Sequence, residues 1–117
     1  MACILVVDDD PDVREVSSIM LEDLGYTVLQ AGCGDEALAL LAEHPDLCVM
    51  VTDIRMPGMS GLELSDIATL RRRDLGVVLM SAYFQPQLIE RRFVQKPFRT
   101  HELDAAIRAE LSCRGSA

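Results

Sequence analysis

Three consecutive carboxylates stand directly after an apolar run near the start of the chain. Asp8, Asp9 and Asp10 follow the run 3–7. A β-branched apolar run bounded by turn residues predicts a buried strand, so these acids would crowd together at the rim of a sheet. Like charges held together cost free energy unless a cation neutralises them, and Mg²⁺ prefers oxygen ligands. The pattern therefore predicts a divalent-cation site.

Other reactive side chains follow the later apolar runs. Each comes directly after a run that predicts a strand: Asp53, Ser81 and Lys96. In an open parallel sheet the carboxyl ends of the strands share one edge, and ligands bind there. A carboxylate can act as a nucleophile toward phosphorus, while a metal ion, an ammonium group and a hydroxyl neutralise charge on the transferred oxygens. This set of residue types therefore indicates phosphoryl transfer.

The elements that would position these residues alternate between strand and helix along the chain. The expected strands are 3–7, 26–31, 47–52, 76–80 and 93–95. The expected helices are 11–24, 35–43, 61–70 and a final one that Thr100 caps. This alternation predicts a single α/β domain, 1–117, with a parallel sheet and helices on both faces.

Two parts of this layout carry specific expectations. In the first helix, apolar residues recur at helical spacing and are expected to face the core: Val13, Val16, Ile19, Met20 and Leu24. Asp10 is expected to cap that helix, and Gly25 to close it. The segment 83–92 should hold the crossover helix before the last strand. It is short and contains Pro86, so we expect a shortened or irregular helix there.

The composition narrows the class of partner and the compartment. The chain has 11 basic and 19 acidic residues and a net charge of −8. This balance argues against nucleic acid as a direct partner, because phosphate binding needs a basic face. The four cysteines show no CxxC spacing, which argues against a zinc or redox site. Cys3 and Cys48 fall in apolar runs and are expected as buried thiols, which favours a reducing cytoplasm. No apolar run is long enough for insertion into a membrane.

Four motifs resemble the receiver domain of bacterial two-component response regulators. They are the segments 4–9, 52–61, 81–82 and 96–98, in the order that this family shows. The resemblance implies a flavodoxin-like, doubly wound five-stranded parallel sheet of order 2-1-3-4-5. The segment 81–96 is shorter than is usual in the family by roughly two helical turns. The segment 93–98 resembles the receivers of hybrid histidine kinases.

The resemblance also implies a role for each reactive residue. Asp53 would be the phosphoacceptor, Asp9 a direct Mg²⁺ ligand and Asp8 a ligand through water. Asp53 itself and the backbone carbonyl of Arg55 would complete the protein ligands of the metal. Lys96 would pair with the acceptor and with the phosphoryl group.

Signalling by such a domain would depend on a switch and on partners. Ser81 would be the switch hydroxyl that moves toward the phosphoryl group, and Phe93 stands where the family has its switch aromatic. A histidine kinase or a histidine phosphotransfer domain would donate the phosphoryl group. The output partner is unknown, and a homodimer remains open. The resemblance implies no enzyme, beyond an intrinsic Mg²⁺-dependent self-phosphorylation and autodephosphorylation.

Two alternatives explain part of the pattern. A haloacid-dehalogenase-like phosphohydrolase would use Asp8 as nucleophile and Asp10 as general acid, but it leaves Asp53 and the turn 56–58 without a role. A receiver-like binding module that works without phosphate would not need the intact set of acids. The phosphorylated residue separates the three: Asp53 in a receiver, Asp8 in a hydrolase and neither in a binding module.

Overall fold

The computed structural model describes residues 2–82 and 91–115. The elements follow one another as β1 (Cys3–Val7), α1 (Pro11–Asp23), β2 (Thr27–Ala31), α2 (Gly34–Glu43), β3 (Leu47–Asp53), α3 (Gly61–Arg71), β4 (Gly76–Ser81), β5 (Arg92–Gln95) and α4 (Thr100–Gly115). Their bounds agree with the expected ones to within about one residue wherever both ends were predicted. Within the described ranges, none of the helices combines the length and the apolar character needed to cross a membrane.

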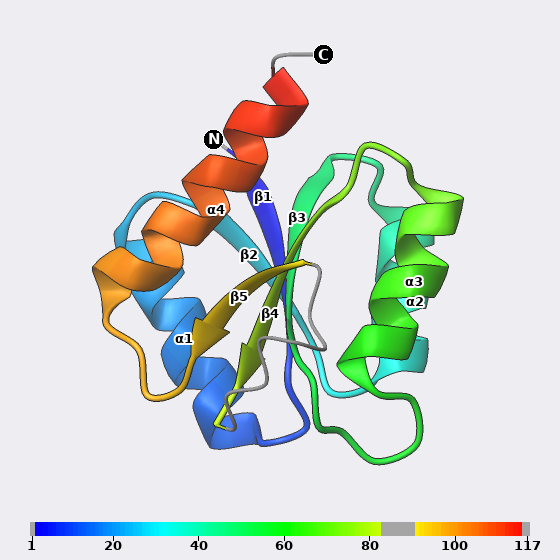
Figure 1. Cartoon of the computed structure of the whole chain (residues 1–117), viewed down its shortest axis with the longest axis horizontal. Helices are drawn as coiled ribbons and strands as arrows, with labels where there is room; N and C mark the ends of the chain where they lie inside the picture. The colour runs from blue at the N-terminus through cyan, green and yellow to red at the C-terminus, as the bar shows by residue number, and fades with distance from the viewer. Residues whose placement is uncertain (1, 83–90, 116–117) are drawn as a thin grey trace.

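The five strands form one parallel sheet in the order β2-β1-β3-β4-β5. Helices α1 and α4 cover one face of this sheet, and α2 and α3 cover the other (Figure 1). The predicted flavodoxin-like, doubly wound order 2-1-3-4-5 is therefore confirmed. In this order β1 and β3 are neighbours, which brings together the ends of two strands that are far apart in the sequence.

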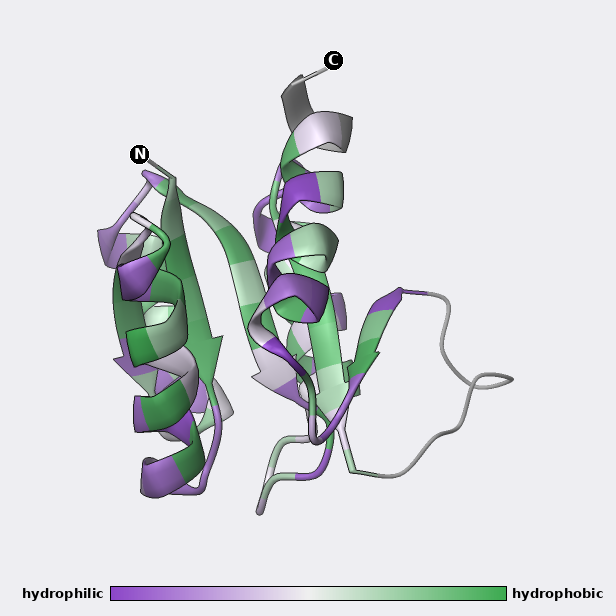
Figure 2. Ribbon diagram, turned by 90° about the vertical axis from the view of Figure 1, so that its left-hand side faces the viewer, coloured by the Kyte–Doolittle hydropathy of each residue, from purple (hydrophilic) through white to green (hydrophobic). Residues whose placement is uncertain are grey.

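The central strands are buried on both faces. Leu5 and Met50 pack toward α2 and α3, while their neighbours Ile4 and Val51 pack toward α1 and α4. Figure 2 shows these strands mainly in the green of hydrophobic residues. Parallel strands covered on both sides need continuous apolar runs rather than alternation, which is why the sequence located them reliably.

The buried face of α1 differs from the predicted one. Val16 is 58% exposed and Ile19 47% exposed, whereas Ser17, Ser18 and Leu21 are buried against the sheet. Small serine side chains allow the helix to approach the sheet closely. The Ser18 hydroxyl donates a hydrogen bond to the Arg14 carbonyl at 2.8 Å, so its burial leaves no polar group unsatisfied. The prediction that Val16, Ile19 and Leu24 face the core was therefore wrong.

The helix ends confirm two predictions and correct one. Asp10 caps α1 by accepting hydrogen bonds from two backbone N–H groups of the first turn, and Gly25 follows the helix with a φ of 100°. Thr100, by contrast, is the first residue of α4 and not its cap. At the start of α4 it is Glu102 that binds the preceding backbone: its carboxylate accepts a hydrogen bond from the Arg99 N–H at 2.8 Å.

The predicted shortened or irregular helix in 83–92 lies almost wholly outside the described residues. Of that segment, Arg92 already opens β5, and Arg91 precedes it in a bend. The Arg91 guanidinium contacts Asp66 at 3.2 Å and the Thr69 hydroxyl at 3.1 Å, both on α3. The residue that precedes β5 is thus bound to α3.

Candidate functional site

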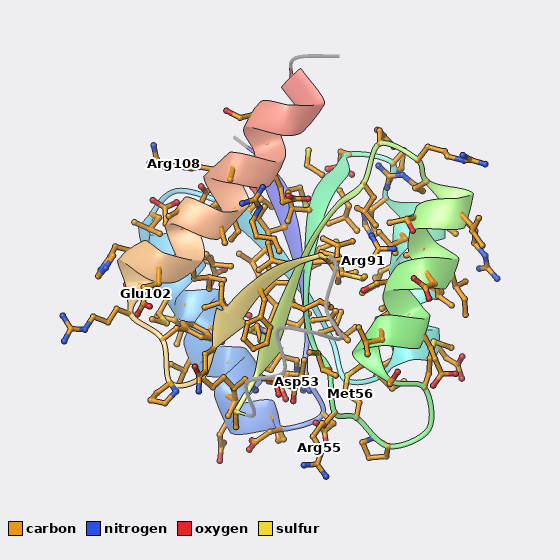
Figure 3. The ribbon with its side chains drawn as sticks, viewed as in Figure 1. Asp53, Arg55, Met56, Arg91, Glu102 and Arg108 are labelled. Carbon is orange, nitrogen blue, oxygen red and sulfur yellow. The ribbon has the colours of Figure 1, made fainter. Side chains whose placement is uncertain are left out.

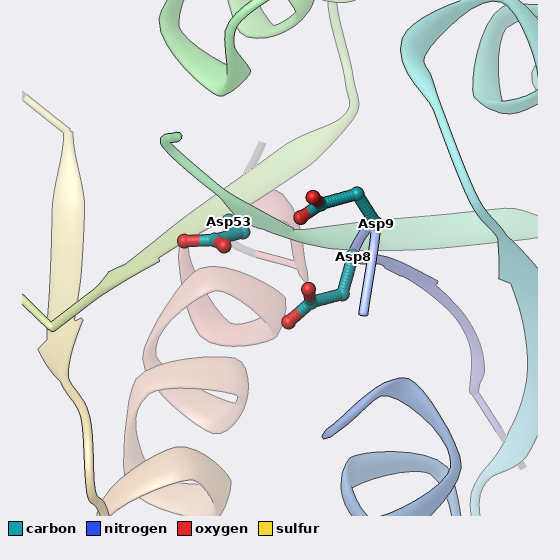
Figure 4. Close-up of side chains that lie close together, drawn as sticks. All are labelled: Asp8, Asp9 and Asp53. Carbon is teal, nitrogen blue, oxygen red and sulfur yellow. The ribbon is translucent and has the colours of Figure 1, made fainter. Parts of the chain in front are cut away.

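Three carboxylates meet at the carboxyl end of the sheet. Asp8 and Asp9 come directly after β1, and Asp53 is the last residue of the neighbouring strand β3. One carboxylate oxygen of each lies within 4.8 Å of the others. Figure 4 shows the three side chains side by side beyond the strand ends. Asp8 is buried, Asp53 is partly buried and Asp9 is exposed, so the cluster opens to solvent on one side.

Asp8 is held at all four of its polar atoms. Its backbone N–H donates to the Ala31 carbonyl at 3.2 Å, and its own carbonyl accepts from Arg14 Nη1 at 2.8 Å. Its two carboxylate oxygens accept from the Asp10 backbone N–H at 3.0 Å and from the Lys96 ammonium at 2.8 Å. A carboxylate that is only 1% exposed is thereby satisfied, as burial of a charge requires.

Lys96 brings a cation into this acidic cluster. It follows β5, and its backbone N–H donates to the Ser81 carbonyl at 2.8 Å. Its ammonium lies 2.8 Å from the Asp8 carboxylate and 3.4 Å from that of Asp53. The peptide bond to Pro97 is cis. Lys96 is the only lysine among the 11 basic residues of the chain.

Burial and charge shift the pKa values of two of these groups. Burial raises the pKa of Asp53 above its ordinary value; Lys96 opposes this, and the neighbouring carboxylates of Asp8 and Asp9 add to it. Burial lowers the pKa of Lys96, but its hydrogen bond to Asp8 and the attraction of both carboxylates outweigh burial. The pKa of Lys96 therefore lies above its ordinary value. The carboxylates around the site thus contribute to both shifts, and a divalent cation would offset their negative charge.

Ser81 lies on β4, the strand next to β3, and Phe93 lies on the edge strand β5. Ser81 is the last residue of β4 and is buried. It comes one residue after Met80, which pairs in register with Asp53. Phe93 on β5 pairs in register with Leu79 on β4, and its side chain is partly buried against the apolar cluster beneath α2 and α3.

The loop after β3 carries Arg55 and brings Gly61 against the backbone of Asp53. Figure 3 shows Arg55 and Met56 at the same end of the molecule as Asp53, and the Arg55 side chain is exposed. The Gly61 backbone N–H donates to the Ile54 carbonyl at 2.8 Å. A Cβ atom on Gly61 would lie 2.1 Å from the Asp53 carbonyl oxygen. Only glycine therefore lets α3 begin this close to the end of β3.

Sequence reasoning missed two supporting residues. Gly61 was expected as the start of a helix and the end of the motif 52–61, but its contact with Asp53 depends on the path of the loop 54–60, which no spacing rule predicts. Arg14 was not singled out at all. A weak signal was present, because Arg14 lies one helical turn beyond Asp10 and so near the end of β1.

The donor set fits a hard divalent cation. All three acidic side chains offer oxygen, the ligand that Mg²⁺ prefers, and the open side of the cluster leaves room for the waters that Mg²⁺ keeps. Asp10 does not join them: its carboxylate accepts from the Asp12 N–H at 3.0 Å and serves as the cap of α1. The hydrolase alternative, which needs Asp10 as a general acid, is therefore not favoured.

Comparison with known sequences identifies the family. The model of the response regulator receiver domain matches residues 4–108. The DNA-binding response regulator MtrA of Mycolicibacterium smegmatis is 34% identical over 118 residues, which cover 92% of this chain and 50% of MtrA. The chain thus spans about half the length of this curated relative.

Solved structures agree with the sequence matches. The response regulator protein TrrA of Thermotoga maritima, solved in complex with Mg²⁺-BeF, is 31% identical with a TM-score of 0.86, over 94% of this chain and 99% of TrrA. The complex of the histidine kinase ThkA with TrrA contains a chain that is 32% identical with a TM-score of 0.85, over 95% of this chain and 99% of that one. The chain belongs to the response regulator receiver domain family.

Proposed function

We propose that Asp53 accepts a phosphoryl group from a histidine kinase or a histidine phosphotransfer domain, and that the whole chain, 1–117, acts as one receiver domain. The observation that carries this proposal is the meeting of three carboxylates within 4.8 Å, with the Lys96 ammonium 3.4 Å from Asp53. A signalling domain of a two-component system needs this combination: an acceptor, a metal site and a fixed cation.

Each residue of the cluster has a distinct part in the proposed transfer. An Asp53 oxygen attacks phosphorus, a P–O bond forms as the P–N bond to the donor histidine breaks, and the imidazole nitrogen regains a proton. Mg²⁺ bound by Asp8, Asp9, Asp53 and the Arg55 carbonyl would neutralise charge on the phosphoryl oxygens. The Lys96 ammonium, 3.4 Å from Asp53, supplies a further positive charge. Intrinsic self-phosphorylation and autodephosphorylation use the same residues.

Ser81 and Phe93 form the proposed switch. Ser81 stands at the end of β4, next to the strand that carries Asp53, so its hydroxyl can turn toward a phosphoryl group there. Phe93 on the adjacent edge strand is only partly buried, which leaves room for a change of its position. Phosphorylation would shift the equilibrium between two arrangements of these side chains.

The exposed apolar side of α1 is the proposed docking surface for the phosphoryl donor. A groove of about 390 Å³ runs between α1 and the segment after β5, and its lining includes Val13, Val16, Met20 and Phe98. Lys96 lines the same groove and lies 3.4 Å from Asp53. A helix that carries the donor histidine could thus bury its apolar face on α1 while its histidine reaches the acceptor. The solved ThkA–TrrA complex supports a histidine kinase as this partner.

The compartment and the remaining partners follow as proposals. Cys3, Cys33 and Cys48 are unpaired thiols, which supports the reducing cytoplasm. The net charge of −8 supports the absence of direct nucleic-acid binding by this chain. The DNA binding named for MtrA belongs to a protein of which this chain matches 50%.

Intact-mass measurement after treatment with acetyl phosphate and Mg²⁺ tests the proposed function. Wild-type protein should gain one phosphoryl group, Asp53→Asn should gain none, and Asp9→Ala should lose the dependence on Mg²⁺. Asp10→Asn is the matched control, because it removes a neighbouring carboxylate that caps α1 and should still be phosphorylated. A phosphoryl group mapped to Asp8 would support the hydrolase, and an unmodified wild type would support the binding module.

A further inference from the structure

Arg14 joins three elements behind the acidic cluster. It lies near the start of α1, and its Nη1 donates a hydrogen bond to the Asp8 carbonyl oxygen at 2.8 Å. Its Nε donates to Gln30 Oε1 at 3.2 Å, and Gln30 lies on β2. A single guanidinium therefore ties the loop after β1 to both α1 and β2.

The Asp8 carbonyl is the point at which this contact can control the metal site. This carbonyl and the N–H of Asp9 belong to one planar peptide unit. The preceding peptide is also held, because the Asp8 N–H donates to the Ala31 carbonyl at 3.2 Å. Arg14 thus sets the plane from which the Asp9 side chain departs. Asp9 itself is exposed, so packing cannot hold its carboxylate in place.

The space around the guanidinium is shaped for it. A Cβ atom on Gly32, just after β2, would lie 3.2 Å from Arg14 Nη1 and 3.1 Å from Glu36 Oε1. Glu36 Oε1 accepts a hydrogen bond from the Gly32 N–H at 3.2 Å. The bare backbone of Gly32 therefore leaves room for Arg14 between the ends of β1 and β2.

We propose that Arg14 is a positioning residue for the divalent cation, and that it sets the affinity and the Mg²⁺ selectivity of the site by holding the Asp8–Asp9 peptide. This inference rests on the metal site of the proposed function. Coulomb repulsion alone predicts the opposite: removal of a positive charge beside three carboxylates should strengthen cation binding. The sign of the change therefore separates positioning from simple electrostatics.

Titration calorimetry with MgCl₂ shows whether the loss of Arg14 weakens or strengthens Mg²⁺ binding. We expect Arg14→Met to raise the Kd for Mg²⁺ about tenfold, the lower end of the loss seen when groups that orient metal ligands are removed. Arg14→Lys can still donate to the Asp8 carbonyl and should recover part of the loss. Arg73→Met removes the same charge from an exposed position after α3, at the opposite end of the sheet, and should leave the Kd unchanged.

Comparison of Mg²⁺ with Ca²⁺ provides a readout that a loss of stability alone would not move. Mg²⁺ demands near-ideal octahedral geometry, whereas Ca²⁺ tolerates a flexible set of oxygens. A loosened Asp8–Asp9 peptide should therefore weaken Mg²⁺ binding more than Ca²⁺ binding. We expect the ratio of the Kd for Mg²⁺ to the Kd for Ca²⁺ to rise severalfold in Arg14→Met and to a smaller extent in Gln30→Ala.

The possible results distinguish a failure of the positioning role of Arg14 from a failure of the proposed function. If wild-type protein binds Mg²⁺ and the Arg14→Met Kd is unchanged or lower, the positioning role is wrong and the metal site stands. If wild-type protein does not bind Mg²⁺, the proposed function itself fails. If circular dichroism shows that Arg14→Met does not fold, Arg14→Lys and Gln30→Ala replace it in the test. A ratio of the Kd for Mg²⁺ to the Kd for Ca²⁺ equal to that of wild type in both variants would then overturn the inference.

Discussion

The Lys96 ammonium donates a hydrogen bond to the Asp8 carboxylate at 2.8 Å. The same ammonium is 3.4 Å from Asp53, so its shorter contact is with Asp8 and not with the proposed acceptor. Lys96 and a divalent cation would therefore compete for the charge of Asp8. This relationship links the metal site to the position of the only lysine in the chain.

Replacement of Lys96 should strengthen metal binding. Loss of the competing ammonium frees the buried Asp8 carboxylate, and a net hydrogen-bond contribution of about 1 kcal/mol corresponds to roughly a fivefold change in affinity. We expect Lys96→Met to lower the Kd for Mg²⁺ about fivefold in calorimetry, while phosphorylation by acetyl phosphate slows. Lys96→Arg keeps the charge and serves as the control. Weaker Mg²⁺ binding in Lys96→Met would contradict the competition.

The titration of Lys96 can be followed directly by NMR. Because Lys96 is the only lysine of the chain, selective labelling of lysine gives the signals of this side chain alone. In metal-free protein the pKa of Lys96 should lie above 10.5, because Asp8 and Asp53 outweigh burial. A raised lysine pKa stabilises the fold below the unfolded value, and this stabilisation is lost as the pH rises through the folded pKa. Asp8→Asn should lower the pKa of Lys96, and an unchanged value would exclude Asp8 as the main partner.

Asp53→Asn should stabilise the metal-free protein at neutral pH. Burial raises the pKa of Asp53, so its charged form is disfavoured in the fold. The stability associated with Asp53 is present below the unfolded pKa of about 3.8 and is lost as the pH rises through the higher folded value. Urea unfolding in chelator at neutral pH should show a gain of about 1 kcal/mol for Asp53→Asn, the usual size of a single stabilising substitution. A gain that persists in full at the acid end of the range would point to another cause.

Gly61→Ala should disrupt the acceptor loop. The added methyl group would lie 2.1 Å from the Asp53 carbonyl oxygen, so the backbone must move. We expect a loss of about 3 kcal/mol in the free energy of unfolding, the cost of overpacking. Gly58→Ala is the matched control. A Cβ atom on Gly58 would have no neighbour within 4 Å, so this substitution costs only the left-handed backbone conformation, about 1 kcal/mol. Equal losses at the two positions would remove the role assigned to Gly61.

Substitutions on α1 should separate its two faces. Leu21 is buried, and Leu21→Ala should cost about 3 kcal/mol in urea unfolding. Val16→Glu should change stability by no more than about 0.5 kcal/mol but should slow transfer from a cognate histidine kinase, because Val16 lines the proposed docking groove. Ile19→Glu places the same charge on an exposed residue outside the groove lining and should leave transfer intact. Equal slowing by Val16→Glu and Ile19→Glu would exclude a specific role for the groove.

Much of the fold could be read from continuous apolar runs. The runs that became β1, β3 and β4 are buried on both faces in the structure, and such runs require strands in a parallel sheet. The face of α1 could not be read in this way. Its apolar stripe and its buried stripe are different, because helical periodicity locates an apolar face without saying whether the sheet or another surface will cover it.

The order of residues along the chain was enough to predict which side chains stand at the strand ends, since Asp8, Asp53, Ser81 and Lys96 each follow a run that favours a strand. The tertiary structure decided what those residues touch. Contacts such as Lys96 with Asp8, Gly61 with the Asp53 carbonyl and Arg14 with the Asp8 carbonyl depend on strand order and loop paths. Local propensities describe neighbours in sequence, whereas these contacts arise when distant segments pack against one another.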